Sequence, residues 1–130
     1  MLFRSVFRLA DTYLMLAEAQ LLTGKVTEAT ASINMVRRRA AWPGKAAEME
    51  ITPAQMNFEM LIEERGRELV GEQTRWLDLK RWGNLVERVQ KYNPQASANV
   101  KAMHYLRPIP QTQIDRSTDG KTAFPQNPGY

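Results

Sequence analysis

The 130-residue sequence contains no cysteine and a single histidine, His104. Without cysteine the chain forms no disulfide, offers no thiol nucleophile and holds no cysteine-ligated zinc. With one histidine it cannot build a multi-histidine metal site within one chain. The sequence has no run of about 18 or more apolar residues, so it predicts no membrane-spanning helix. We expect no metal and no cofactor.

A strong excess of charge of one sign is also missing. The 18 Lys and Arg residues exceed the 14 Asp and Glu residues by four, and they are spread along the chain apart from one cluster at Arg37–Arg39. Nucleic-acid binders gather basic residues on one face or arm, so we expect no nucleic-acid partner. The start of the chain does not read as a signal peptide, because Arg4 and Arg8 interrupt its apolar residues. Hydrophobic residues make up 43% and charged residues 25%, which is typical of a globular domain.

Apolar residues recur at helical spacing in two segments, about Arg4 to Leu22 and about Val26 to Ala40. Gly24 suits the left-handed end of the first helix, and the short connection predicts an antiparallel helical hairpin. A tetratricopeptide helix pair has the same alternation of large and small residues as Tyr13-x-x-Leu16-Ala17, Gly24 and Ala29-x-x-x-Ile33. Any antiparallel helical hairpin explains these residues equally well.

Two further helices are predicted beyond a loop over residues 42–51. Thr52 and Gln55 form the pattern of a capping box that opens the first of them, which Gly71 interrupts. The second is expected over Thr74 to Val89. Five of the seven prolines fall within residues 93–130, which predicts an irregular but ordered tail laid over the helices, with a flexible tail as the alternative. The predicted fold class is therefore all-α, with a tetratricopeptide-like hairpin, two more helices and a Pro-rich tail in one domain, residues 1–130.

Acidic residues in the second half of the chain invite comparison with a glycosidase. Glu64 and Glu68 share a helix face, and two carboxylates of different environment can act as general acid and base. Each acid in this region, however, has an arginine at helical reach, which favours the ionised form and is the opposite of what a general acid requires. On this basis we pair Glu63 and Glu64 with Arg67, Glu68 with Arg65, and Asp78 with Arg75 and Arg81. We predict no catalytic residue and a structural network of ion pairs and aromatic contacts made by Glu64, Arg65, Glu68, Arg75, Trp76, Asp78 and Arg81.

Three tryptophans are candidates for stacking on a sugar. Trp76 and Trp82 lie at helical spacing and are predicted to belong to the core. Trp42 lies in the loop between Ala41 and Pro43, which makes it a weak candidate for ligand binding and equally a structural residue. His104 has no acidic neighbour in the sequence and is not expected to be catalytic.

Five blocks in this order resemble the C-terminal part of the SusD/RagB family of outer-membrane nutrient-binding lipoproteins. The blocks are Arg8-Leu9-Ala10-Asp11-x-Tyr13-Leu14-Met15-Leu16-Ala17-Glu18-Ala19, Ile33-Asn34-x-Val36-Arg37-x-Arg39-Ala40, Ile62-Glu63-Glu64-Arg65-x-Arg67-Glu68-Leu69 continued by Glu72-x-x-Arg75-Trp76-x-Asp78-Leu79-x-Arg81-Trp82, Leu106-Arg107-Pro108-Ile109-Pro110, and Gln126-Asn127-Pro128-Gly129-Tyr130.

The resemblance implies a mostly helical, non-catalytic protein at the surface of the outer membrane, with tetratricopeptide-like pairs. It further implies binding of a glycan or other nutrient for polysaccharide utilisation, with a SusC-like TonB-dependent transporter as partner. The best-known ligand-contacting aromatics of the family lie in a part that this sequence lacks, so none is carried over.

Met1 lies just before the first block, which suggests a fragment or a truncated gene. A fragment of this kind is expected to expose apolar surface or to self-associate. The alternative function is a stand-alone tetratricopeptide-like adaptor that binds a peptide or protein partner in its helical groove.

Overall fold

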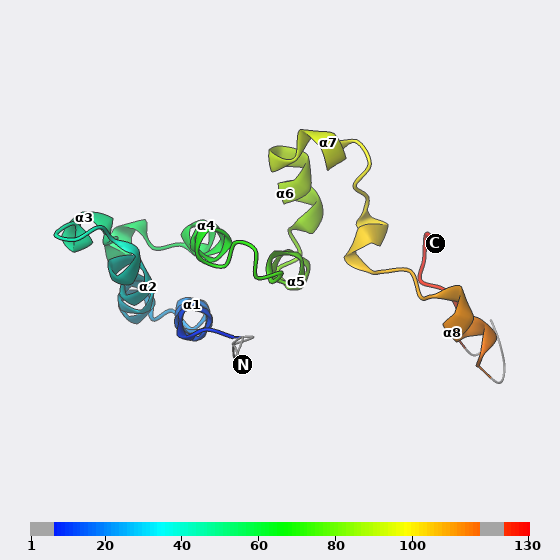
Figure 1. Ribbon diagram of the computed structural model, residues 1–130, viewed down its shortest axis with the longest axis horizontal. Helices are drawn as coiled ribbons and strands as arrows, with labels where there is room; N and C mark the ends of the chain where they lie inside the picture. The colour runs from blue at the N-terminus through cyan, green and yellow to red at the C-terminus, as the bar shows by residue number, and fades with distance from the viewer. Residues whose placement is uncertain (1–6, 118–123) are drawn as a thin grey trace, which may run out of the picture. The chain divides into compact units, whose positions relative to one another are not determined.

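The computed structural model describes residues 7–117 and 124–130, and every regular element in that part of the chain is a helix (Figure 1). The predicted all-α fold class is confirmed. The chain divides into two compact units, which we call unit 1 (up to Arg75) and unit 2 (from Trp76 onward), and each is described by itself. The single domain over residues 1–130 stays a prediction. None of the helices in the described ranges is long and apolar enough to cross a membrane.

Unit 1 opens with the predicted hairpin, α1 (Leu9–Leu22) and α2 (Val26–Ala40). The second helix has the predicted bounds. The first begins later than predicted, because the backbone of Arg8 is extended, and residues 4–6 of the prediction lie outside the described residues. Gly24 links the helices at φ 77°, a left-handed conformation that costs glycine little.

The core of unit 1 lies between α1, α2 and α4 (Phe58–Glu68). Leu14, Ala17, Ala29, Ile33 and Leu61 are fully buried there. The two alanines let α1 and α2 approach closely, and the larger aliphatic side chains fill the space toward α4. The alternation of large and small residues expected of a tetratricopeptide-like pair therefore has a packing role.

The segment between α2 and α4 is more ordered than predicted. The expected loop contains the single turn α3 (Ala46–Met49). Asn34 of α2 fixes the following strand-like stretch, because its side-chain amide donates to the carbonyl of Ile51 at 2.9 Å and accepts from the Ile51 N–H at 3.0 Å.

The predicted start of the next helix is corrected. Gln55 does accept from the backbone N–H of Thr52 at 2.9 Å, but these residues cap only a 3₁₀ turn, η1 (Pro53–Gln55). The α-helix starts afresh at Phe58, where the Asn57 side chain accepts from the Met60 N–H at 2.9 Å. The residue that caps the α-helix is therefore Asn57, five residues after Thr52.

From Arg75, the last residue of unit 1, through unit 2 the chain contains more breaks than predicted. The single helix expected over Thr74 to Val89 is two, α5 (Arg75–Arg81) and α6 (Leu85–Tyr92), because the chain turns at Gly83 with φ 72°. Three short turns follow, α7 (Pro94–Ser97), η2 (Ala102–Tyr105) and α8 (Gln111–Asp115). Tyr105 holds η2 to the turn before α6, since its hydroxyl donates to the Gly83 carbonyl at 2.6 Å.

The chain end is fixed to an earlier part of the tail by side-chain amides. Gln126 accepts from the Ile109 N–H at 2.7 Å and donates to the Ile109 carbonyl at 2.9 Å. Asn127 donates to the Arg107 carbonyl at 2.7 Å, and the Tyr130 hydroxyl donates to the Leu106 carbonyl at 3.0 Å. These bonds fix residues 126–130 to residues 106–109 within unit 2.

Candidate functional site

The predicted acid pair of α4 lies between helices, and different arginines hold its two members. The Glu64 carboxylate, whose side chain is 8% exposed, accepts from Arg37 of α2 and from Arg67 at 3.0 Å. Arg37 also donates from Nε to the Met49 carbonyl. Glu64 therefore joins α4 to α2 and to the turn after it.

Glu68 joins three helices at their ends. Its carboxylate, 7% exposed, accepts from Arg8 Nη1 at 2.9 Å and from Arg39 Nη2 at 2.7 and 2.8 Å. Arg8 also donates to the Glu68 carbonyl at 2.8 Å, which places a cation at the negative end of α4. Its Nε donates to Glu72 at 2.8 Å. These contacts, first with Glu72 and then with Glu68, raise the pKa of Arg8 above its ordinary value.

The partner that the sequence suggested for Glu68 is different in the structure. Arg65 instead pairs with Asp11 of α1, with 2.9 Å between Nη1 and Oδ1. Both side chains are almost fully buried, at 4% and 7% exposure. Helical spacing finds partners only on the same helix, whereas this contact depends on how α1 and α4 pack.

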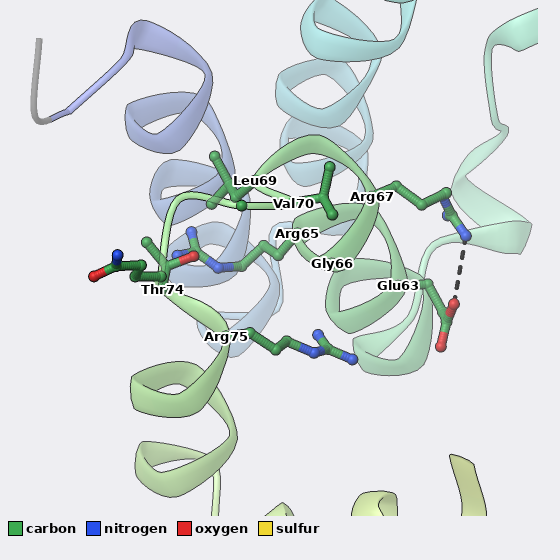
Figure 2. A pocket seen from close by; sticks show the side chains of 10 residues that line it. Glu63, Arg65, Gly66, Arg67, Leu69, Val70, Thr74 and Arg75 are labelled. Atoms are coloured by element: carbon green, nitrogen blue, oxygen red, sulfur yellow. Dashed lines mark hydrogen bonds and ion pairs between the residues drawn. The ribbon is translucent and has the colours of Figure 1, made fainter. Parts of the chain in front are cut away.

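Arg75 lies against α4 at Gly66, a residue without a side chain. Its Nη1 donates to the Ile62 carbonyl at 2.8 Å. A Cβ atom added at Gly66 would lie 3.2 Å from the same nitrogen, so the glycine makes room for the guanidinium. Figure 2 shows Arg75 below Gly66, with Arg65 and Arg67 leaving α4 on opposite sides.

A cavity of about 450 Å³ opens beside these residues at the end of α4 (Figure 2). Its wall includes three arginines, Arg65, Arg67 and Arg75, together with Glu63, which pairs with Arg67 at 3.4 Å. Gln73, which also lines it, has a left-handed backbone, φ 61°, which is uncommon for a residue with a side chain. Each charged side chain of the wall has a partner within the protein: Arg65 pairs with Asp11, Arg67 with Glu63, and Arg75 with the Ile62 carbonyl. The cavity therefore offers guanidinium groups that donate hydrogen bonds and no pair of carboxylates.

The rest of the predicted network lies in unit 2. Asp78 is buried and pairs with Arg81 at 3.0 Å, as helical spacing predicted. The Arg81 guanidinium lies 4.6 Å from the ring centre of Trp82, and that of Arg107 lies 5.7 Å from Trp76. Both tryptophans are half-buried rather than core residues.

Trp42 and His104 lie outside this cavity. The Trp42 side chain is 83% exposed in the turn after α2. His104 has a local structural contact, because its Nδ1 accepts from the Lys101 N–H at 2.8 Å at the start of η2. In the described ranges there is no group of three or more metal-ligating side chains.

Several members of the network were missed by the reasoning from helical spacing. They are Arg8, Asp11, Arg37, Arg39, Gly66 and Glu72. A signal was available for all but Gly66, since they stand in the sequence blocks that carry the family resemblance. The contacts, however, run between different blocks, and the residues within one block do not show which other block they meet.

Comparison with known proteins gives matches along nearly the whole chain. The model of the SusD family matches residues 4–130. SusD-like protein P25 of Formosa agariphila is 37% identical over 114 residues, which cover 85% of this chain and 22% of that protein. SusD-like protein P2 of the same organism is 32% identical over 130 residues, 95% of this chain and 25% of that protein. The chain thus spans about a quarter of these relatives or less, and no solved structure matches it significantly.

Proposed function

Because the chain belongs to the SusD family, we propose that it forms the C-terminal helical part of a nutrient-binding protein of the outer membrane. In this proposal the whole protein binds a glycan or other nutrient at the cell surface and delivers it to a SusC-like TonB-dependent transporter. The family match supports the class of protein. Nothing in the geometry or the comparisons supports the alternative of a stand-alone adaptor.

The role is one of binding without covalent chemistry, and the arrangement of Glu64 and Glu68 carries this part of the proposal. Both carboxylates are bound by arginines from α2 or from the start of α1. A glycosidase needs two carboxyl groups that face its substrate, whereas the carboxylates of Glu64 and Glu68 are 8% and 7% exposed and are hydrogen bonded to arginines. The network acts as a clamp between helices.

Glu68→Gln tests this interpretation. Loss of the charge should weaken the contacts with Arg8 and Arg39 and lower the melting temperature. A variant that melts like the wild type but loses a measurable glycosidase activity would contradict the proposal.

The location of the ligand site is tested by isothermal titration calorimetry with a panel of oligosaccharides. We expect little heat from the 130-residue chain, because Trp42 is its one weak candidate for a ligand-stacking residue. Micromolar binding that Trp42→Ala abolishes would place the site here and overturn this part of the proposal.

Sequencing the DNA upstream of the Met1 codon tests whether the chain is part of a longer protein. Several hundred more codons and a lipobox cysteine would support the proposed whole protein.

A further inference from the structure

The side chain of Met103 packs against a glycine near the end of the chain. Gly129 has a left-handed backbone, φ 96°, and a Cβ atom added to it would lie 2.9 Å from Met103 Cβ, 3.1 Å from Sδ and 3.5 Å from Cε. Three side-chain atoms of Met103 therefore lie along the face of the glycine where other residues carry a side chain. Gly129 is exposed and Met103 is half-buried, so the contact lies at the surface of unit 2.

Met103 belongs to a turn that is anchored. It lies in η2, whose last residue, Tyr105, has a hydroxyl that donates to the Gly83 carbonyl at 2.6 Å and accepts from the Val86 N–H at 3.4 Å. These bonds fix η2 to the start of α6. A change in the size or polarity of the Met103 side chain is therefore taken up on the other side of the contact, by residues 124–130.

The chain end is held by side chains rather than by regular structure. Residues 124–130 contain no helix, and the side chains of Gln126, Asn127 and Tyr130 bond to the backbone of residues 106–109. These three residues flank Gly129 on both sides along the chain. A displacement of the backbone at the glycine therefore acts on all of these bonds.

Methionine is the residue of this contact that an oxidant can change. The sequence has seven methionines and no cysteine, so a peroxide meets thioethers and no thiol. The Met103 sulfur attacks one oxygen of hydrogen peroxide, an S–O bond forms and the O–O bond breaks. The second oxygen leaves as water, with the proton of the oxygen now bound to sulfur. Sulfur loses two electrons and the peroxide gains them, and a flexible apolar side chain becomes a polar, chiral sulfoxide.

We propose that Met103 is a redox-sensitive contact, whose oxidation by a peroxide releases residues 126–130 from residues 106–109. The sulfoxide is larger than the thioether, and the space beside Gly129 is already filled by the methionine. Its oxygen also accepts hydrogen bonds from water, which draws the side chain away from the glycine. The inference concerns unit 2 alone and does not rest on the proposed function.

Two exposed methionines provide a comparison within the same chain. Met15 on α1 and Met35 on α2 are 48% and 46% exposed, so a sulfoxide at either position turns to water without displacing backbone. The effect expected at Met103 thus comes from its contact with Gly129 and not from oxidation as such.

Amide hydrogen exchange of the 130-residue chain before and after treatment with dilute hydrogen peroxide tests the proposal. Mass spectrometry of peptides reports which methionines are oxidised. The matched variant is Met103→Leu, because leucine has a similar volume and no sulfur. In the wild type we expect exchange at the Ile109 amide, which donates to Gln126, to quicken about tenfold, the factor that loss of one or two ordinary hydrogen bonds gives. In Met103→Leu we expect no change, although its exposed methionines are oxidised.

Reversal by methionine sulfoxide reductases is a second test that needs no variant and decides the matter if leucine itself loosens the chain end. The two enzymes together reduce both sulfoxide epimers, and we expect slow exchange at Ile109 to return. Unchanged exchange in a wild type oxidised at Met103, quickening that the reductases do not reverse, or equal quickening in Met103→Leu would each overturn the proposal. So would a Met103 that stays reduced when Met15 and Met35 are fully oxidised.

Discussion

Unit 1 and unit 2 are held by different kinds of polar contact. In unit 1, buried charges join separate helices, as in the pair of Arg65 with Asp11 and the capture of Glu68 by two arginines. In unit 2, the neutral side chains of Gln126 and Asn127 bond to the backbone of an irregular segment. Unit 1 has one amide contact of the same kind, that of Asn34 with the backbone of Ile51, and adds to it the buried charges that join helices.

The difference follows from what each unit has to satisfy. Regular helices bond their own backbone, so most of the ion pairs of unit 1 serve to set how helices meet, while Asn34 supplies partners to the non-helical Ile51. Its buried hydrophobic cluster comes from α1, α2, α4 and the segment before α4. The described part of unit 2 has stretches without helix, and the buried hydrophobic residues in it are Leu79, Leu85 and Ile114. There the amide side chains supply partners to backbone groups that lack helical ones.

The sharpest way to break the comparison is to remove one buried charge from unit 1. Arg65→Met leaves the Asp11 carboxylate buried without its cation, so we expect a loss of about 3–5 kcal/mol in the free energy of unfolding measured with urea. Arg67→Met is the comparison on the same helix and should cost less, because its side chain is 53% exposed and its buried partner Glu64 keeps the contact with Arg37.

Adding Asp11→Asn to the Arg65→Met variant should restore part of the stability, because the buried carboxylate is then gone. Equal, small losses for Arg65→Met and Arg67→Met would show that burial does not distinguish the two arginines, and that charge is not what fixes α1 to α4.

In unit 2 the corresponding change is Gln126→Ala. It leaves both the N–H and the carbonyl of Ile109 without their partner, and we expect a cost of about 1–3 kcal/mol. The readout is hydrogen exchange at the Ile109 amide, which should quicken. Gln113→Ala, at an exposed position of α8, should leave that amide unchanged. Unaltered exchange at Ile109 in the Gln126→Ala variant would mean that the chain end does not hold this segment.

Substitution of one glycine in each unit should have a smaller effect on stability than the changes above. Gly24 and Gly129 both have left-handed backbones, at φ 77° and 96°, so alanine strains each by about 1 kcal/mol or more. A Cβ atom at Gly129 would also lie 2.9 Å from that of Met103, whereas one at Gly24 meets nothing within 4 Å. We expect Gly129→Ala to lower the free energy of unfolding more than Gly24→Ala does. It should also break the hydrogen bond from the Tyr130 hydroxyl to the Leu106 carbonyl, which a change in the chemical shift of Tyr130 would report. Equal losses of stability in the two variants would contradict close packing of Gly129 against Met103.

The sequence predicts the features that depend on local spacing and misses those that depend on tertiary packing. The bounds of α2 and the hairpin turn at Gly24 follow from local spacing, and both were predicted correctly. The start of α4 was wrong because two capping signals compete within six residues, and Asn57 rather than Thr52 begins the α-helix. Local signals cannot rank two such caps without the packing of the helix that follows.

The ion pairs show the same limit. Contacts at three or four residues, such as Asp78 with Arg81, were found from spacing. Contacts such as Arg65 with Asp11 and Glu68 with Arg8 join residues more than fifty positions apart, and they require the arrangement of α1 against α4. The residue types were the right ones, but their partners are a property of tertiary packing.

An exposed ion pair gives the smallest effect and completes the contrast with the buried charges. Arg38 donates to the carboxylate of Glu50, chiefly through a hydrogen bond, and lowers the pKa of Glu50. Because the folded pKa lies below the unfolded one, the stabilisation is present above the unfolded value and is lost as the pH falls through the folded value. In an NMR titration Arg38→Gln should move the Glu50 midpoint upward, toward the ordinary glutamate value. High salt should do the same to the wild type, since exposed pairs are screened. A midpoint unmoved by either change would mean that the pair does not persist in solution.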